Sequence, residues 1–228
     1  KFRIDTGTAA PTRQRSYRHP PEAKRELAKQ ISKMLDANLI SRSNSVWSSP
    51  VILVKKKVPI NTPNALPESR VCCDYRKINK IIKQESFPLP LLQETIESLA
   101  ENPPVWFCSL DFKSAYSSIE LEPETSEKLT FVTHMGAMKP HRLNFGISTA
   151  PSFFQRVLSG VFRDVKYKNL SVYIDDLLTW HDSIESMIES LSEIFDRVRN
   201  VQLRLNGPKC VFGVTEIAYL GHVLTREG

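Results

Sequence analysis

Two adjacent acidic residues between two apolar runs are the feature that most constrains this chain. Asp175 and Asp176 follow the run 170–174 and precede the run 177–180, and both runs are rich in strand-forming residues. Neighbouring carboxylates repel each other, and apolar surroundings raise their pKa values. Most Asp pairs lie in solvated turns, but a solvated turn does not need apolar residues packed up to both acids. A divalent cation would offset the repulsion, so the pattern favours a β-hairpin that carries a cation site.

A third oxygen donor stands at the end of another short apolar run. Residues 105–111 have the pattern of a strand, and this strand ends in Asp111. Two separate strands that each end in Asp can supply the carboxylates of a two-metal phosphoryl-transfer site. Carboxylate oxygens and a phosphate substrate point to Mg²⁺. From the residues alone we therefore predict that Asp111, Asp175 and Asp176 form one acidic cluster.

The remaining elements are predicted from apolar periodicity and turn residues. Helices are expected at 22–39 and 150–162, and a third helix is expected to be capped by Asp182 with Glu185 three residues later. Further strands are expected at 70–75, 129–133, 138–143 and within 203–210, the last of these running into a turn.

Three motifs in a fixed order make this sequence resemble a known family. They are LDFKSAY at 110–116, FGISTAPSFFQR at 145–156 and SVYIDD at 171–176. The set resembles reverse transcriptases, first the polymerases of gypsy-type long-terminal-repeat retrotransposons and next those of retroviruses. The resemblance covers nearly the whole chain, and the ordered set is far more specific than any single motif.

The resemblance implies an α+β right-hand polymerase fold, with an antiparallel palm sheet packed on helices. It places the fingers at 1–85 and 119–150, and the palm at 86–118 and 151–228, where the chain would end at the primer-grip hairpin. Residues 1–21 form a basic arm, which fits a nucleic-acid contact and a solvated tail about equally. The family's thumb, connection and RNase H regions are expected to be absent from this chain.

The implied activity is RNA-directed and DNA-directed DNA synthesis on a primer 3′-hydroxyl. Asp111, Asp175 and Asp176 are the implied catalytic residues, and with Phe112 they would hold two Mg²⁺ ions, for which Mn²⁺ is a substitute. The implied partners are an RNA or DNA template with its primer, deoxynucleoside triphosphates, and the rest of a Pol polyprotein (thumb, connection, RNase H and integrase). No membrane contact is expected, a dimer is compatible with the resemblance, and the expected location is intracellular, in a cytoplasmic virus-like particle.

Candidate nucleotide-binding residues are carried over from matching positions of the family motifs. Lys56, or one of its neighbours in Lys55–Lys57, and Arg70 correspond to residues that bind the triphosphate. Tyr116 corresponds to the steric gate, a ring beneath the sugar that leaves no room for a 2′-hydroxyl. The other candidates share motif positions near the metal and phosphates: Phe112, Lys113, Ala115 and Phe145.

Candidate primer and template contacts form a second group that the resemblance implies: Asp74, Arg76, Asn79, Gln155, Tyr173, Leu220 and Gly221. Asp74 and Arg76 fit a template contact and an internal ion pair equally well. A glycine at 221 fits a backbone that the primer end approaches closely. The family usually has Pro where this chain has Asn144, and this departure makes the entry to the nucleotide pocket less rigid.

Three other functions share part of this pattern. An RNA-templated RNA polymerase has the same palm, but Tyr116 argues against ribonucleotide substrates. A two-metal nuclease has no use for a steric gate or for cations on the fingers. The non-enzymatic alternative is a catalytically silent nucleic-acid-binding or structural subunit derived from a reverse transcriptase, and the three intact acids count against it. The net charge of +6 suits a polyanionic partner in each case.

Overall fold

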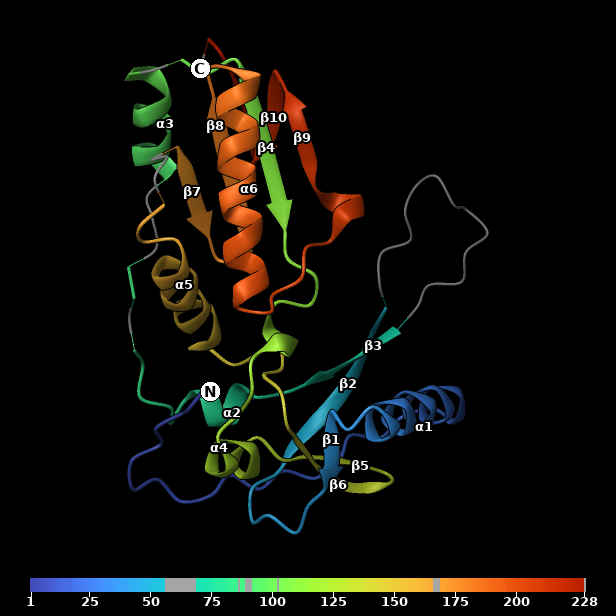
Figure 1. The fold of residues 1–228 in the computed structure, drawn as a ribbon. Coiled ribbons are helices and arrows are strands. Elements are labelled where there is room, and N and C mark those ends of the chain that lie inside the picture. The colour runs from blue at the N-terminus through green and yellow to red at the C-terminus, as the bar shows by residue number, and fades with distance from the viewer. Residues whose placement is uncertain (56–68, 86, 89–91, 102, 166–168, 228) are drawn as a thin grey trace. The chain divides into compact units, whose positions relative to one another are not determined.

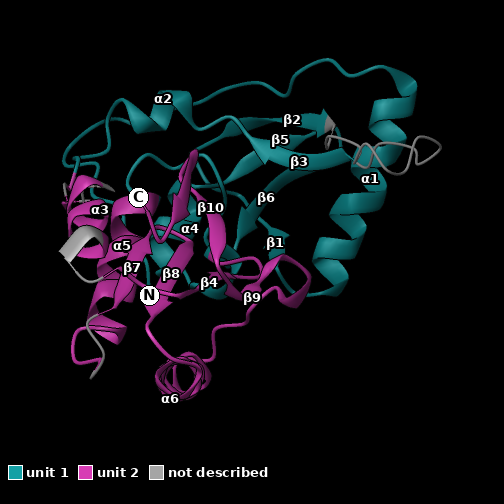
Figure 2. Cartoon of the chain, turned by 90° about the horizontal axis from the view of Figure 1, so that it is seen from above, with its two compact units in different colours: residues 1–84, 116–150 teal, residues 85–115, 151–228 magenta. Residues whose placement is uncertain are grey.

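The computed structural model describes residues 1–55, 69–85, 87–88, 92–101, 103–165 and 169–227. The chain divides into two compact units (Figure 2). Unit 1 comprises Lys1–Gln84 and Tyr116–Ala150, and unit 2 comprises Glu85–Ala115 and Pro151–Gly228. Both units combine helices with a mainly antiparallel sheet, which confirms the predicted α+β class.

Unit 1 is built on a five-stranded sheet in the order β1-β6-β5-β2-β3 (Figure 1). All neighbouring strands are antiparallel except β2 and β5, which are parallel. The strands are β1 (Ile40–Arg42), β2 (Ser49–Lys55), β3 (Ser69–Cys73), β5 (Phe131–Thr133) and β6 (Gly136–Pro140). The helices are α1 (Pro21–Asp36), α2 (Arg76–Asn79) and α4 (Pro123–Lys128), with a 3₁₀ turn η1 (Tyr116–Ser118).

The core of unit 1 lies between α1 and the sheet. Leu27 and Ile31 are four residues apart, so they share one face of α1, and both are fully buried. They pack against Ile40, Val51 and Phe131 from three different strands. The predicted helix is confirmed, and it ends three residues earlier than expected, at Asp36.

The N-terminal arm, residues 1–21, packs against the rest of unit 1. Phe2 and Ile4 are almost completely buried, and the Phe2 backbone N–H donates to the Glu120 carbonyl at 2.7 Å. Further along, the Gln14 backbone N–H donates to the Ser48 carbonyl at 3.1 Å. Backbone pairing and burial of this kind do not occur in a solvated tail, so that alternative for residues 1–21 is wrong.

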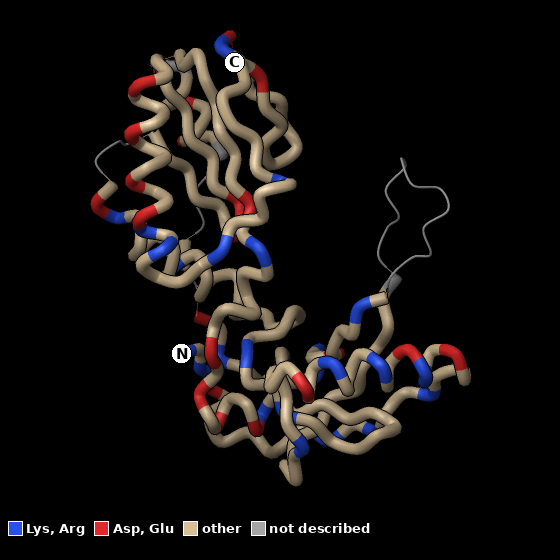
Figure 3. The backbone as a smooth tube through the Cα atoms, turned by 45° about the vertical axis from the view of Figure 1, so that its right-hand side comes forward, with Lys and Arg blue, Asp and Glu red and all other residues tan. Residues whose placement is uncertain are grey.

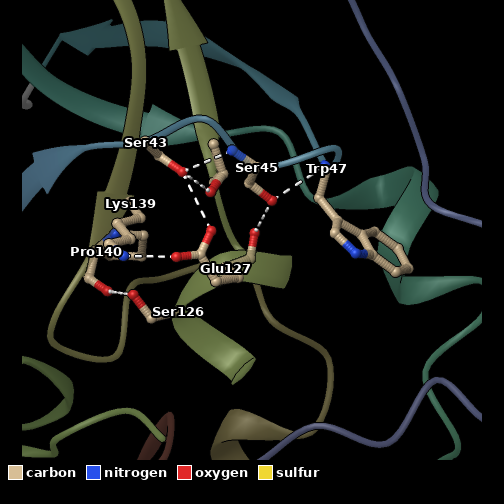
Figure 4. A network of polar contacts seen from close by, with 8 residues as sticks. Ser43, Ser45, Trp47, Ser126, Glu127, Lys139 and Pro140 are labelled. Atoms are coloured by element: carbon tan, nitrogen blue, oxygen red, sulfur yellow. Dashed lines mark hydrogen bonds and ion pairs between the residues drawn. The ribbon is translucent and has the colours of Figure 1, made fainter. Parts of the chain in front are cut away.

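A polar network around Glu127 joins three segments of unit 1 (Figure 4). Ser43 Oγ donates to the Glu127 carboxylate at 3.3 Å, and Ser45 Oγ donates to the Glu127 carbonyl at 2.8 Å. Lys139 on β6 forms an ion pair with the same carboxylate, which lowers the Glu127 pKa from its usual value. The network ties α4 to β6 and to the β1–β2 connection.

Unit 2 is built on a four-stranded antiparallel sheet in the order β7-β8-β4-β9, with a separate β10–β11 hairpin (Figure 1). The strands are β4 (Trp106–Asp111), β7 (Leu170–Tyr173), β8 (Asp176–His181), β9 (Val211–Val214), β10 (Glu216–Tyr219) and β11 (His222–Thr225). The helices are α3 (Leu92–Glu101), α5 (Ala150–Val161) and α6 (Ile184–Asn200), with a 3₁₀ turn η2 (Gly207–Lys209).

One buried cluster joins the sheet of unit 2 to α3 and to the β10–β11 hairpin. Phe107 and Leu178 are fully buried, and Trp180 is 4% exposed. Leu99, Ile217, Tyr219 and Leu224 complete the cluster. Because this core packs against β4 and β8, it fixes the two strands that carry the predicted acids.

Two local predictions in unit 2 are wrong. Helix α6 is capped by Ser183, whose side chain accepts from the Ser186 backbone N–H in a reciprocal capping box, and not by Asp182 with Glu185. The strand expected within 203–210 is also displaced. Leu205 makes an isolated bridge to Phe112, the 3₁₀ turn η2 follows, and the strand is β9, after the turn.

The basic charge of the sequence is concentrated in unit 1. Unit 1 contains 21 Lys and Arg against 10 Asp and Glu, and unit 2 contains 10 against 15, so their net charges are +11 and −5. Figure 3 shows acidic positions following one another along α6, which carries Glu185, Glu189, Glu193 and Asp196. That face of α6 does not suit a polyanion. None of the described helices is both long enough and apolar enough to cross a membrane.

Candidate active site

The predicted acidic residues come together at one end of the unit 2 sheet. Asp111, the last residue of β4, is paired directly with Asp176, the first residue of β8. Asp176 is also paired with Tyr173, which closes the β7–β8 hairpin. The turn residues are therefore Ile174 and Asp175, one position earlier than the predicted Asp175-Asp176 turn. Asp111 therefore ends β4, Asp175 lies in the turn, and Asp176 begins β8.

Charge repulsion at this cluster appears in the pKa of Asp176. Partial burial raises it above 3.8, and the negative charges of Asp175 and then Asp111 raise it further. Lys209 acts in the opposite direction. The three carboxylates therefore interact electrostatically, and the site favours a cation or a proton.

Asp111 already has two side-chain partners, and the sequence did not predict either of them. Asn206 donates from Nδ2 to Asp111 Oδ1 at 3.0 Å, and Lys209 Nζ lies 3.1 Å from Oδ2. Both partners belong to the turn between α6 and β9. The Asn-Gly-Pro-Lys sequence indicates a turn, but no local signal shows which strand end the turn contacts.

The donor set at this cluster fits a hard divalent cation. Within the described ranges, no group of three His, Cys, Asp or Glu side chains is close enough to form a ready-made metal site. The oxygens nevertheless come from three carboxylates on paired or adjoining backbone positions, and the Lys209 ammonium neutralises one of them as a metal ion would. Carboxylates with one exchangeable cationic partner suit Mg²⁺ or Mn²⁺.

Gln155 on α5 holds the hairpin that carries Asp175. Its Oε1 accepts from the Ile174 backbone N–H at 2.6 Å, and its Nε2 donates to the Val172 carbonyl at 2.8 Å. Ile174 has φ of +55°, an unfavourable backbone conformation for a β-branched residue. Gln155 is 1% exposed, so the predicted contact of its side chain with primer or template is wrong. The Gln155 amide instead stabilises the turn through these two hydrogen bonds.

Two residues of the segment after Asp111, Phe112 and Ala115, are buried. Phe112 is 4% exposed and its ring stands edge-on to Phe154 at 6.1 Å. The Lys113 backbone N–H donates to the Arg204 carbonyl at 2.8 Å, so the predicted phosphate contact by that N–H is not supported. Ala115 is 5% exposed.

The β10–β11 hairpin has a two-residue turn at Leu220 and Gly221. Their φ values are +48° and +84°, the pattern of a type I′ turn, which favours glycine. A Cβ at Gly221 would meet no described atom within 4 Å. The turn conformation is sufficient to explain the glycine, and the predicted close approach of a primer end to Gly221 stays a prediction. Leu220 and Tyr173 pack against the core cluster of unit 2, and their contact with primer or template stays a prediction.

Unit 1 contains the predicted steric gate. Tyr116 is 9% exposed, and Phe145, 53% exposed, stands edge-on to its ring with centroids 5.1 Å apart. A cavity of about 150 Å³ adjoins Phe145 and is also lined by Cys72, Ser117 and Asn144. Asn144 Nδ2 donates to the Tyr75 hydroxyl at 3.5 Å, so the residue that replaces proline is tied to the unit 1 core.

Asp74 and Arg76 form the internal pair that was one of their two predicted roles. Arg76 donates to both carboxylate oxygens of Asp74, at 2.8 and 2.7 Å. Tyr17 from the N-terminal arm also donates to Asp74, at 2.7 Å. The Asp74 pKa is held well below its usual range, chiefly by Arg76. The Arg76 side chain remains 82% exposed, so an oriented guanidinium faces solvent.

Three other residues of unit 1 are predicted to make contacts, Asn79 with primer or template, and Arg70 and Lys56 with the triphosphate. Asn79 donates to the Gly146 carbonyl at 2.7 Å and accepts from the Ser148 N–H at 3.1 Å, so its amide stabilises this loop. Its contact with primer or template stays a prediction. Arg70 is exposed on β3, opposite Val54 on β2. Lys56 lies outside the described residues.

Comparisons with known proteins agree with these motifs. The family described as "Reverse transcriptase (RNA-dependent DNA polymerase)" matches residues 54–224. The retrovirus-related Pol polyprotein from transposon 412 of Drosophila melanogaster is 32% identical over 219 residues, 96% of this chain and 17% of that protein. The one from transposon 297 of the same organism is 32% identical over 203 residues, 89% of this chain and 19% of that protein. The chain therefore spans less than a fifth of either relative.

Solved structures show the same fold. The foamy viral protease-reverse transcriptase in complex with RNA/DNA hybrid has a TM-score of 0.84 at 20% identity, covering 99% of this chain and 29% of that one. The foamy viral protease-reverse transcriptase dRH in complex with ds DNA has a TM-score of 0.82 at 20% identity, covering 98% of this chain and 37% of that one. At this identity the similarity shows the fold alone.

Proposed function

Because the chain belongs to the reverse transcriptase family, we propose that it transfers deoxynucleotides to a primer 3′-hydroxyl on an RNA or DNA template. The observation that carries this proposal is the direct pairing of Asp111 with Asp176, with Asp175 in the adjoining turn. In this proposal the fingers are residues 1–85 and 119–150, which correspond closely to unit 1, and the palm is residues 86–118 and 151–228, which correspond closely to unit 2. Pyrophosphate leaves as the new phosphodiester bond forms.

The three carboxylates would hold two Mg²⁺ ions, with Mn²⁺ as a substitute and the Phe112 backbone as a further ligand. When bound, the ions would lower the pKa of the 3′-hydroxyl and offset the charge of the triphosphate. Gln155 keeps the Asp175 turn in its unfavourable conformation through two hydrogen bonds. Tyr116 and Phe145 would pack beneath the sugar, and Arg70 and Lys56 would bind the triphosphate.

The proposed partner is a primer–template duplex. The similar foamy viral proteins are in complex with an RNA/DNA hybrid and with ds DNA. In this chain the net charge of +11 on unit 1 supports binding of such a polyanion. The relatives are Pol polyproteins, so we also propose that this chain acts with further Pol regions, in a cytoplasmic virus-like particle.

Primer extension by this chain tests the proposal. A labelled DNA primer on an RNA template, and in parallel on a DNA template, should gain the complementary deoxynucleotide only when Mg²⁺ or Mn²⁺ is present. Duplex binding without any extension would support the silent nucleic-acid-binding subunit instead.

Asp176→Asn should raise the melting temperature of the metal-free chain. The folded-state pKa of Asp176 is raised above 3.8, so the ionised carboxylate destabilises the folded chain. This destabilisation increases as the pH rises above 3.8, and it is complete at neutral pH. We expect a gain of at most about 2–4 °C at pH 7, the shift that about 1 kcal/mol produces in a chain of this size, because solvent screens the partly exposed carboxylate. Differential scanning fluorimetry measures it.

The same experiment contains its own control. The gain should shrink as the pH is lowered toward 4, since the wild-type carboxylate then becomes protonated. Millimolar Mg²⁺ should stabilise the wild type and have a smaller effect on Asp176→Asn. A variant that melts at the wild-type temperature at both pH values would contradict the electrostatic description of the cluster.

Arg70→Ala should impair nucleotide use more than duplex binding. A charged hydrogen bond contributes about 1.5–3 kcal/mol, so we expect the dNTP KM to rise at least about tenfold. The salt dependence of duplex affinity should stay near that of wild type, because few phosphate contacts are lost. Arg25→Ala, an exposed arginine on α1, is the matched control. Equal losses in duplex binding and nucleotide use would refute this role for Arg70.

A further inference from the structure

The turn between α6 and β9 is attached to the end of β4 through Asn206. We propose that Asn206 is a positioning residue, which fixes the Asp111 carboxylate in the orientation that binds the divalent cation. This inference rests on the proposed function and deepens it, because it concerns how the cation site is preformed.

Two hydrogen bonds join Asn206 to Asp111. The Asn206 backbone N–H donates to the Asp111 carbonyl at 2.8 Å, and the Asn206 side chain donates to Oδ1 at 3.0 Å. One residue thus holds both the main chain and the carboxylate of Asp111. Such a pair of contacts leaves the carboxylate little freedom to rotate.

Backbone contacts fix both the residues just before Asn206 and the turn that Asn206 begins. Phe112 forms an antiparallel bridge with Leu205, and the Lys113 N–H donates to the Arg204 carbonyl at 2.8 Å. Within the turn, the Lys209 N–H donates to the Asn206 carbonyl at 2.8 Å. The Asn206 amide therefore approaches Asp111 from a braced backbone.

The two side-chain partners of Asp111 have opposite relations to a cation. Asn206 is neutral and partly buried, so its N–H can stay on Oδ1 while the remaining lone pairs bind a metal ion. Lys209 is cationic and its side chain is 66% exposed, so it competes with a metal ion for Oδ2 and can move into solvent. Asn206 should therefore aid metal binding, whereas Lys209 should oppose it.

A folded Asn206→Ala chain separates positioning from a role in folding alone. In this variant the backbone bond to the Asp111 carbonyl can still form, and only the amide on Oδ1 is removed. If Asn206 mattered only for the fold, the folded variant would bind the metal ion as wild type does. If Asn206 positions the carboxylate, the folded variant should bind the metal ion more weakly, whereas Lys209→Met should bind it more tightly.

The test is Mn²⁺ binding to the full 228-residue chain without nucleic acid, measured by electron paramagnetic resonance of free Mn²⁺. Loss of a hydrogen bond to a ligating group typically weakens metal affinity about 10–100-fold, so we expect at least about a tenfold loss for Asn206→Ala. Lys209→Met should bind Mn²⁺ more tightly than wild type. Asn200→Ala, an exposed asparagine at the end of α6, is the matched control and should bind as wild type does.

Thermal melts accompany each titration, and Asn206→Leu replaces the alanine variant if that variant proves unstable. Wild-type Mn²⁺ affinity in a folded Asn206→Ala or Asn206→Leu chain would overturn this inference and leave the proposed function intact. Weakening by Lys209→Met to the same extent as by Asn206→Ala would also overturn it. Absence of Mn²⁺ binding that depends on Asp111 in the wild type would overturn the proposed function together with this inference.

Discussion

The Asp111→Asn variant is expected to lose primer extension by at least about a hundredfold, about 2.7 kcal/mol of transition-state stabilisation. The substitution keeps the size of the side chain, and an amide oxygen can still accept from Asn206 Nδ2. The negative charge that would attract the divalent cation is lost. Asp175→Asn should have a similar effect, whereas Asp176→Asn should be less severe. Single-nucleotide insertion on a labelled primer measures each loss.

Binding and folding must be separated from catalysis in this experiment. Duplex affinity should stay within about twofold of wild type, because the acids act on the transition state and not on uniform binding. Loss of the exposed Lys209–Asp111 ion pair should alter folding stability by less than about 1 kcal/mol. Asp164→Asn, at an exposed position of unit 2, is the matched control. Turnover at about a tenth of the wild-type rate in Asp175→Asn would remove the two-metal assignment, because a lost metal ligand should cost far more.

The Tyr116→Val variant is expected to gain ribonucleotide use relative to deoxynucleotide use by at least about tenfold, about 1.4 kcal/mol of differential transition-state binding. In the proposed function, the Tyr116 ring occupies the space that a 2′-hydroxyl needs. The ring is buried and held edge-on by Phe145 at 5.1 Å, so it cannot easily move aside. Matched ribo- and deoxynucleotides, inserted on one primer–template, give the two values of kcat/KM.

The ratio distinguishes a gate from a packing role. Tyr116→Val also removes buried area and an aromatic contact of about 0.5–1.5 kcal/mol, so both absolute rates should fall. Losses common to the two sugars cancel in the ratio of kcat/KM values. Tyr116→Phe keeps the ring and should keep the wild-type ratio. An unchanged ratio in Tyr116→Val would rule out the gate and favour the RNA polymerase alternative.

Side-chain amides show where motif matching is insufficient. The motifs assign Gln155 and Asn79 to primer or template contacts, yet each amide spans two backbone groups inside its own unit. An amide has the same donors and acceptors whether its partner is a nucleotide or a loop of the protein. Only the tertiary structure shows that Gln155 is 1% exposed and therefore unavailable to a duplex.

Apolar patterning is a better guide than polar residues to the elements themselves. The buried pair Leu27 and Ile31 predicts α1, and the apolar runs around Asp175 predict the β7–β8 hairpin. The sequence misplaces the cap of α6 because Asp182 and Ser183 both suit a helix start. The geometry selects Ser183, and Asp182 instead accepts from the Ser186 hydroxyl at 2.9 Å.

The sequence by itself determined the family and the fold class through its ordered motifs, and it predicted the acidic residues because strand patterns that end in Asp can be recognised locally. The tertiary structure decided the register that pairs Asp111 with Asp176, and the turn that brings Asn206 and Lys209 to Asp111. Asn206 lies 95 positions from Asp111 along the chain, and Lys209 lies 98 positions from it. Long-range packing alone brings such residues together, since no local backbone preference extends over that separation.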